Sequence, residues 1–341
     1  MKNLMSNLKG FIFFCMVASL ITECVHAQQG SGFQVKKIFH IASPGGWDYI
    51  AVGPDNNRLY VSHGTQVNIL NETNGDSIGV IPNTTGVHGI AFVPALGRGY
   101  TSNGRLNNIT VFDLKTNQIL SMITTGTNPD AIMYDKFSKL IITCNGRSND
   151  LSLIDPISEK LVATIPMGGK PETAVTDEKG RIYVNIEDHN EIIAVDIHLR
   201  KILDRWTLSP SEGPTGLAID LKNNLLFAGC DKTLVVLDAT TGKVTERITI
   251  GDGCDGVVFD PELNYVFASC GEGKLSIIQK VNNGKYSLME NIPTKASART
   301  LALNEKTHVI YLPAADLQKP AVAGTRPTPV PGTFQVLVVG R

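Results

Sequence analysis

A unit of about 40 residues recurs along this chain, and it constrains the fold more than any other feature. Seven copies begin 40 to 44 residues apart in the 341-residue sequence. Their first residues are Asp48, His88, Asp130, Glu172, Thr215, Asp255 and Arg299. A repeat of this period is typical of propellers and other arrays in which small units share one continuous core. The copies therefore predict seven structural units.

Each copy contains four short segments that have the residue types of β-strands. The first segment, such as DYIAV at 48–52, is followed by a turn with Pro, Asp, Asn or Gly, and the second resembles RLYVS at 58–62. The third and fourth segments, such as NITVFD and ILSMIT, are rich in β-branched residues. No long stretch has the 3.6-residue period of an amphipathic helix. We therefore predict an all-β, seven-bladed β-propeller of four-stranded blades.

The last copy lacks a fourth strand, because the chain ends after TFQVLVVG at Arg341. A spare strand precedes the first copy, at Phe33 to Ala42. We expect this N-terminal strand to pair outside the last blade, which would close the ring and remove an open sheet edge. Residues 28–341 are thus predicted to form one propeller domain.

The first 27 residues have the pattern of a secretory signal peptide. Lys2 and Lys9 precede an apolar run from Phe11 to Ile21, and Val25-His26-Ala27 forms a small-x-small cleavage pattern. The run is too short for a retained transmembrane helix, and no later stretch reaches the necessary ~20 residues. We expect an exported protein, periplasmic or extracellular, with no transmembrane span.

Cysteine usage leaves two alternatives open. Cys24 could anchor a lipoprotein, although Glu23 occupies a position where a small residue is expected. Export permits disulfides. Four cysteines remain after residue 27: Cys144, Cys230, Cys254 and Cys270. Cys254 and Cys270 belong to the same predicted blade and are the best candidates for a disulfide.

Several segments resemble a known family. YVSH at 60–63, YTSN at 100–103 and YVNI at 183–186 resemble the YVTN repeat, and GWDYIAV and PGTFQVLVVGR are similar to segments of the secreted, surface-layer-associated YncE-like propellers. The resemblance extends over Phe33 to Arg341 and implies a propeller fold. The family's name member is associated with DNA binding. Nucleic acid is nevertheless an unlikely partner here, because 31 basic and 32 acidic residues give a formal charge of −1 and no basic footprint.

In a propeller, the start of each first strand and the loop after each second strand should meet at one mouth of the central channel. Binding residues usually collect in such loops. We predict that ten polar or aromatic residues there form a ligand site: Trp47, Asp48, His63, His88, Arg105, Asp130, Arg147, Glu172, Asp255 and Arg299. The alternative is a wet channel mouth in which these side chains are merely solvated.

The charges at this mouth suggest how it would work. Four of the seven strand starts are carboxylates, which raise one another's pKa unless a cation intervenes, and Arg299 is the expected cation. Two Asn-Gly-Arg segments place Arg105 and Arg147 at equivalent positions of neighbouring blades. A guanidinium suits carboxylate or phosphate, so we expect a small anionic or zwitterionic ligand, unless these segments are only structural hairpins.

A metal site is a further hypothesis. His88, Asp48 and Asp130 offer imidazole and carboxylate ligands that suit a divalent metal as cofactor, with His88 as the candidate catalytic base. No HExxH, CxxC or EF-hand spacing supports it. By contrast, the aspartates that end third strands should bond the following turn and be structural; they are Asp113, Asp155, Asp196 and Asp238.

Three functions follow, in decreasing order of support. The first is a monomeric binding module or scaffold for a small ligand, a peptide or another exported protein. The second is a metal-assisted lyase or lactonase-type hydrolase, so enzymatic activity stays open. The third is nucleic-acid binding.

Overall fold

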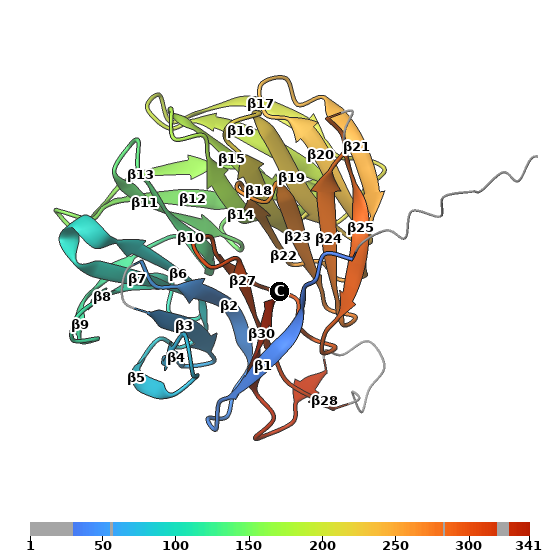
Figure 1. The fold of residues 1–341 in the computed structure, drawn as a ribbon. Coiled ribbons are helices and arrows are strands. Elements are labelled where there is room, and N and C mark those ends of the chain that lie inside the picture. The colour runs from blue at the N-terminus through green and yellow to red at the C-terminus, as the bar shows by residue number, and fades with distance from the viewer. Residues whose placement is uncertain (1–29, 55–56, 282–283, 319–326) are drawn as a thin grey trace, which may run out of the picture.

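Seven four-stranded antiparallel sheets are arranged in a ring in the computed structural model, which describes residues 30–54, 57–281, 284–318 and 327–341 (Figure 1). The predicted seven-bladed propeller is therefore confirmed. The segment predicted to be a signal peptide, residues 1–27, lies outside the described residues. Within the described ranges, no helix has the length and hydropathy needed to cross a lipid bilayer.

Blades 1 to 4 follow one another along the chain, each running from an inner to an outer strand. Blade 1 comprises β2 (Trp47–Val52), β3 (Arg58–His63), β4 (Gln66–Asn71) and β5 (Ser77–Ile81). Blade 2 comprises β6 (Val87–Val93), β7 (Arg98–Asn103), β8 (Asn108–Asp113) and β9 (Ile119–Thr124), with a 3₁₀ turn η1 (Pro94–Leu96). Blade 3 comprises β10 (Pro129–Asp135), β11 (Leu140–Asn145), β12 (Asp150–Asp155) and β13 (Lys160–Pro166). Blade 4 comprises β14 (Pro171–Thr176), β15 (Arg181–Ile186), β16 (Glu191–Asp196) and β17 (Lys201–Thr207), with a second 3₁₀ turn η2 (Glu187–His189).

Blades 5 and 6 repeat this order, whereas blade 7 departs from it. Blade 5 comprises β18 (Gly216–Asp220), β19 (Leu225–Cys230), β20 (Thr233–Asp238) and β21 (Val244–Thr249). Blade 6 comprises β22 (Gly256–Asp260), β23 (Tyr265–Cys270), β24 (Lys274–Lys280) and β25 (Tyr286–Pro293). Blade 7 has the order β26 (Ala302–Asn304), β27 (Val309–Ala314), β30 (Gln335–Gly340) and β1 (Gln34–His40). A short hairpin of β28 (Leu317–Gln318) and β29 (Thr328–Pro329), which the repeat does not predict, interrupts it.

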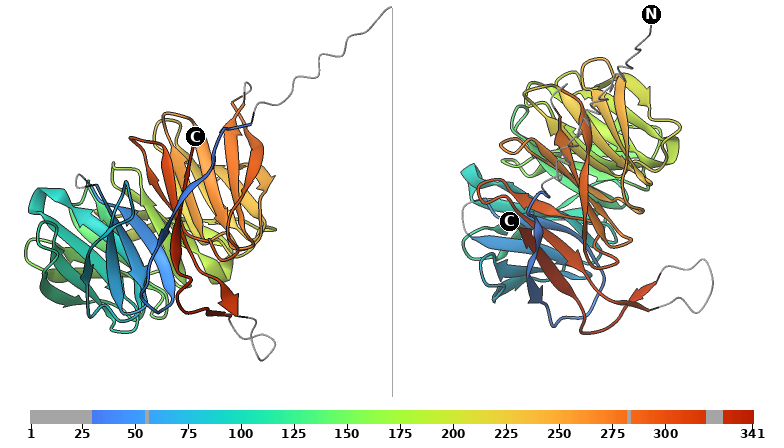
Figure 2. Two further views of the ribbon diagram at one scale, coloured as in Figure 1. Left: turned by 60° about the horizontal axis from the view of Figure 1, so that its bottom comes forward. Right: turned by 45° about the vertical axis from the view of Figure 1, so that its right-hand side comes forward.

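The ring is closed by pairing of the two ends of the described chain. Strand β1 lies antiparallel to β30, with Gln34 opposite Gly340 and His40 opposite Gln335, as Figures 1 and 2 show in blue and dark red. The predicted N-terminal closing strand is thus confirmed. Because β1 pairs with β30 as the outermost strand of blade 7, the outer edge of β30 is not left open.

The core lies between neighbouring blades, where the second and third strands are buried on both faces. Strands β3, β4 and their equivalents show four or more consecutive buried residues, as expected for strands covered on each side. Turns between the third and fourth strands are fixed by aspartate: Asp113 Oδ1 accepts the backbone N–H of Lys115 (2.9 Å) and Thr116 (2.7 Å). Asp238 does the same for Thr240 and Thr241, so the structural role predicted for these aspartates is confirmed.

The four cysteines within the described residues are buried free thiols. Cys254 and Cys270, the pair that the sequence favours for a disulfide, are free thiols in the hydrophobic core between blades 5 and 6. The Cys254 thiol donates to the Gly256 carbonyl (3.7 Å), and the Cys270 thiol donates to the Ala268 carbonyl (3.6 Å).

Candidate functional site

The candidate site lies where inner strands of four blades begin, and β-bulges place its side chains there. In blade 1 the β2–β3 register shifts between Trp47 and Ile50, so that Asp48 lies in the bulge. Blades 2, 3 and 4 shift in the same place, which puts His88, Asp130 and Glu172 in equivalent bulges. A bulge changes the direction of a side chain and is common beside functional sites. Four non-adjacent sequence positions thereby meet around one channel.

Asp48, His88 and Asp130 form the centre of this site. His88 Nδ1 lies 2.6 Å from Asp48 Oδ2 and 3.7 Å from Asp130 Oδ1. On the other side of Asp48, Arg299 Nη2 donates to Asp48 Oδ1 (3.1 Å), while Arg299 Nε lies 2.5 Å from Asp255 Oδ2. Arg299 is therefore the cation between carboxylates that the sequence predicts. The five side chains come from five blades.

A second cation continues the chain of charges into blade 4. Lys170 Nζ lies 2.7 Å from Glu172 Oε1 and also pairs with Glu187, which begins η2. Lys170 was not among the predicted site residues. Its position directly before β14 is a usable signal, because Lys170 is only two residues from the predicted site residue Glu172. Blade 5 contributes no charge at the equivalent position, where Thr215 donates to the Cys254 carbonyl.

Burial and mutual repulsion shift the acids of this site. Burial and the charge of Asp48 raise the pKa of Asp130 to about 6. Burial and the charge of Asp130 raise the pKa of Glu172 to about 8. Burial opposes ionisation of Asp48 as well, but the His88 hydrogen bond and the Arg299 charge outweigh it and lower the pKa of Asp48. Of the two acids at the centre of the site, Asp130 is thus the one whose pKa is raised.

His88 responds in the opposite direction. Burial lowers its pKa, but the hydrogen bond to Asp48 and the charge of Asp130 outweigh burial and raise the pKa of His88 above 6.5. A carboxylate on each side favours imidazolium, so His88 gains a proton more readily than a free histidine.

An apolar cavity of about 160 Å³ adjoins the charged side chains. Its lining includes Tyr49, Met133 and Cys144. Gly89 also lines it and allows close packing, because an added Cβ would lie 2.8 Å from Ile132 Cγ2. The Tyr49 hydroxyl lies within reach of Thr173, and burial together with the charges of Asp130 and Asp48 raises the pKa of Tyr49 far above 10. Tyr49 therefore lines the apolar cavity and also lies near the carboxylates of the mouth. Sequence reasoning missed this residue, although an aromatic directly after Asp48 is a visible signal.

Trp47 and His63 lie apart from the charged network. Trp47 is 9% exposed and packs on Phe334, and His63 is 1% exposed. The His63 ring bonds Ser43 (2.8 Å) and Asn68 (3.2 Å), and burial lowers its pKa. Both residues are covered by the segment before β2 and by Phe334, and we no longer include them in the ligand surface.

Arg105 and Arg147 are exposed in the loops after β7 and β11. The asparagines of the two Asn-Gly-Arg segments are buried clamps: Asn103 binds Asn108 (2.9 Å) and Thr110 (2.8 Å), and Asn145 binds Asp150 (2.7 Å) and Ser152 (2.9 Å). A Cβ added at Gly104 would lie 2.7 Å from His88 Nε2. Glycine is needed there to make room for the imidazole rather than to form the turn.

Comparison with solved structures supports the fold. The chain is similar to a chain of Kuenenia stuttgartiensis hydrazine synthase, with a TM-score of 0.70 and 15% sequence identity, over 80% of this chain and 94% of the other. At this identity the likeness concerns the propeller fold. No protein-family model matches the sequence. The search of curated proteins finds no match either.

The raised pKa values predict that the folded chain is more stable at pH 5 than at pH 8. An acid whose pKa is raised by folding destabilises the folded state once the pH exceeds the pKa that the acid has in the unfolded chain. A histidine whose pKa is raised by folding stabilises the folded state at low pH and loses this effect as the pH rises through its folded-state pKa. Asp130, Glu172 and His88 all act in this direction. Urea unfolding should show a decrease on the order of 2 kcal/mol between these pH values. The double variant Asp130→Asn/Glu172→Gln should reduce this difference; an unchanged difference would contradict the assignment.

Proposed function

We propose that the chain is a binding module that captures a small zwitterionic ligand, such as an apolar amino acid, at the mouth of its channel. The observation that carries this proposal is the pair of carboxylates, Asp48 and Asp130, that face the same atom, His88 Nδ1. Arg299 neutralises the first, whereas burial and the charge of Asp48 keep the pKa of Asp130 raised. An ammonium group beside Asp130 would supply a compensating positive charge.

Other features near Asp130 suit the rest of such a ligand. The exposed guanidinium groups of Arg105 and Arg147 follow strands of blades 2 and 3, which also carry His88 and Asp130, and each could bind a carboxylate. The adjoining apolar cavity is about 160 Å³. A cavity of ~150 Å³ accepts a benzene-sized molecule, so a short aliphatic side chain would fit.

Isothermal titration calorimetry with leucine as the probe tests this proposal. We expect saturable binding without turnover, and weaker binding of leucinamide, which lacks the carboxylate, and of 4-methylpentanoate, which lacks the ammonium group. Asp130→Asn should weaken leucine binding at least about tenfold, because it removes a charge-assisted hydrogen bond.

Asp204→Asn is the matched control, because Asp204 is exposed on outer strand β17 and lies outside the mouth. It should bind leucine as the wild type does. Equal affinity for leucine and 4-methylpentanoate, or no effect of Asp130→Asn, would overturn the amino-acid assignment.

A metal-assisted lyase or lactonase-type hydrolase is the second candidate. One ligand atom each from Asp48, His88 and Asp130 lie within 4.8 Å of one another, a donor set that suits a divalent ion. The three residues fit a metal, although Arg299 already holds one oxygen of Asp48. A bound metal would supply Lewis acidity. His88 Nε2, beside Gly104, would then be the nitrogen left for proton transfer.

Elemental analysis and thermal melting with ZnCl₂, MnCl₂ or CaCl₂ separate the two candidates. A stoichiometric metal that is lost in His88→Ala would favour the enzyme, whereas leucine binding that persists in EDTA would favour the binding module. A peptide or exported protein remains a further partner to test at the same mouth. Nucleic-acid binding has less support, because Arg299 is already engaged by Asp48 and Asp255.

We further propose that residues 1–27 are removed and that residues 28–341 are exported as a monomeric propeller. We also propose that the chain belongs to the YncE-like, YVTN-repeat propellers. The support is the N-terminal charge and hydropathy pattern and the tyrosines of the repeat, of which Tyr60, Tyr100 and Tyr183 are buried between blades. Mass spectrometry of the mature protein tests the cleavage, and it also distinguishes cleavage after Ala27 from lipidation at Cys24.

A further inference from the structure

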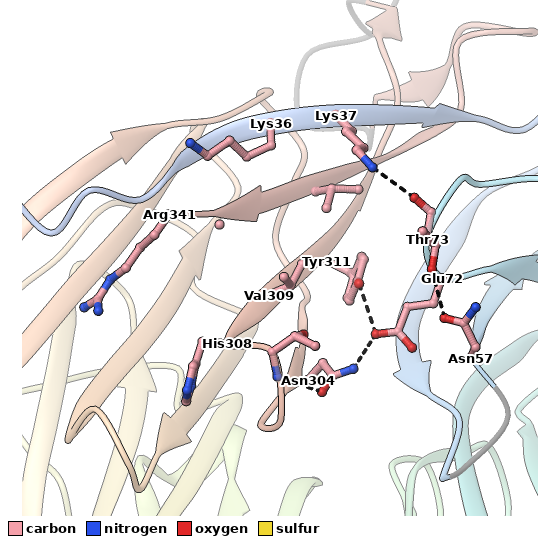
Figure 3. Close-up of a pocket in the computed structure, with 13 residues that line it drawn as sticks. Lys36, Lys37, Asn57, Glu72, Thr73, Asn304, His308, Val309, Tyr311 and Arg341 are labelled. Atoms are coloured by element: carbon pink, nitrogen blue, oxygen red, sulfur yellow. Dashed lines mark hydrogen bonds between the residues drawn. The ribbon is translucent and has the colours of Figure 1, made fainter.

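A cavity of about 500 Å³ lies at the seam between blade 7 and blade 1 (Figure 3). It is lined by Asn57 from the turn between β2 and β3, and by Thr307 and His308 from the turn between β26 and β27. These turns follow the inner strands, whereas the mouth is formed where inner strands begin. This seam cavity is therefore at the opposite end of the ring and is separate from the candidate site described above.

A β-bulge turns two consecutive lysines toward the seam cavity. In the β1–β30 register, Val35 is opposite Val339 and Lys37 is opposite Val338, so Lys36 is the extra residue. In a regular strand, Lys36 and Lys37 would point to opposite faces of the sheet. Both line the cavity here, and Figure 3 shows both on the strand that borders it.

Comparison with the other blades shows that lysine is exceptional at this bulge. Every blade has a bulge at the same place in its outermost strand. The extra residue is apolar in five of the other six blades and threonine in the sixth: Ile78, Leu120, Val162, Leu203, Met289 and Thr245. Packing of an outer strand therefore does not require a lysine at this bulge. In blade 7 the lysine at the bulge lines the seam cavity.

The two lysines have unused charge. Lys37 Nζ donates to the Thr73 carbonyl (3.1 Å), which leaves its other protons for a ligand. Among the described residues, no carboxylate forms an ion pair with Lys36 or Lys37. An ammonium is a compact charge that binds phosphate or carboxylate, so this side of the cavity favours an anion.

The opposite wall offers hydrogen-bond acceptors. Glu72 Oε1 accepts the Tyr311 hydroxyl (3.1 Å) and the Asn304 side chain, as Figure 3 shows. These two bonds fix the carboxylate across the seam, and Oε2 can accept further donors. Asn57 Oδ1 accepts Thr73 Oγ1 (3.2 Å) beside it. Such carboxylate and amide groups bind hydroxyls.

We propose that the seam cavity binds a small polyhydroxylated anion, a sugar phosphate or a uronic acid. Its phosphate or carboxylate lies at Lys36 and Lys37, and its hydroxyls donate to Glu72. The apolar C–H groups of the sugar ring contact Val309 and Val338, which also line the cavity.

Isothermal titration calorimetry on the full chain tests the ligand class with glucose 6-phosphate, glucuronate, glucose and inorganic phosphate. We expect at least one of the two sugar anions to bind saturably, more weakly at high salt, and at least ten times more tightly than glucose or inorganic phosphate. Which of the two binds identifies the anionic group. The proposal would be overturned if neither sugar anion binds, or if inorganic phosphate binds as tightly as the sugar anions do.

Variants then locate the site. Lys36→Met introduces the residue that blade 6 has at the same bulge, and with Lys37→Gln it should weaken binding of the sugar anion at least tenfold. Lys201→Met, on the outer strand of blade 4, is the matched control and should bind normally.

Gly340→Leu keeps both lysines and fills the cavity from β30, where an added Cβ would meet only Val309, at 3.7 Å. It decides the question if the lysine double variant does not fold. Unchanged affinity in Gly340→Leu, or in a folded lysine double variant, would refute binding in the seam cavity.

Discussion

Replacing Phe39 by alanine should lower the free energy of unfolding by about 3–5 kcal/mol, the usual cost of truncating a buried phenylalanine. Phe39 is 5% exposed in the closing strand β1, and it belongs to the hydrophobic cluster that joins blade 7 to blade 1. Its ring packs on Gly75, whose φ of +79° and lack of a Cβ both suit that turn. The substitution therefore leaves a cavity in the contact that closes the ring.

Ile38→Ala is the matched control for this measurement. Ile38 is the adjacent residue of the same strand and is 46% exposed, so its truncation should cost less than about 1 kcal/mol. Urea unfolding followed by tryptophan fluorescence compares the two variants. Equal losses for Phe39→Ala and Ile38→Ala would show that β1 does not close the ring through this face.

Replacing Arg299 by leucine should have the second large effect, a loss of about 2 kcal/mol at pH 8. Breaking a buried ion pair costs about 3–5 kcal/mol, but the Arg299 side chain is 36% exposed, and solvent reduces the expected value. Without the guanidinium, Asp48 and Asp255 face each other and Asp130 across the channel with less positive charge. The pKa of Asp48, which Arg299 helps to lower, should rise.

The pH dependence separates this electrostatic effect from lost packing. Without the guanidinium, the carboxyl groups around the channel have raised pKa values and take up protons as the pH falls from 8 to 5. The stability of Arg299→Leu should therefore recover toward the wild-type value over this range. The exposed Lys201→Leu variant should be neutral at both pH values. A deficit in Arg299→Leu that is the same at pH 5 and pH 8 would assign the loss to packing.

The repeat predicted the fold closely because each strand has a local signature. The predicted fourth strands 77–81 and 119–124 coincide with β5 and β9, and the closing strand differs from β1 only at its ends. The hairpin β28–β29 was not predicted, since it is an insertion that only blade 7 contains. Insertions leave no periodic signal, so a repeat cannot reveal them.

The candidate site was predicted in part. Position within the repeat correctly brought together Asp48, His88, Asp130 and Arg299, because equivalent positions of a ring face one axis. The same reasoning placed His63 at the mouth, but the loop before β2 and Phe334 bury it. Such covering by a segment outside the repeat depends on tertiary packing. Lys36 likewise gains its meaning only from the β1–β30 register, which the sequence does not state.

The pairing of β1 with β30 also affects how the chain can be made. Strand β1, the first of the described strands, has no partner in its sheet until β30, the last described strand, is available. Until then the molecule is an open arc with two unsatisfied edges, which are the surfaces that recruit neighbouring chains in aggregation. Contacts so distant in sequence also slow folding. The ring therefore cannot close before the most C-terminal described strand is in place.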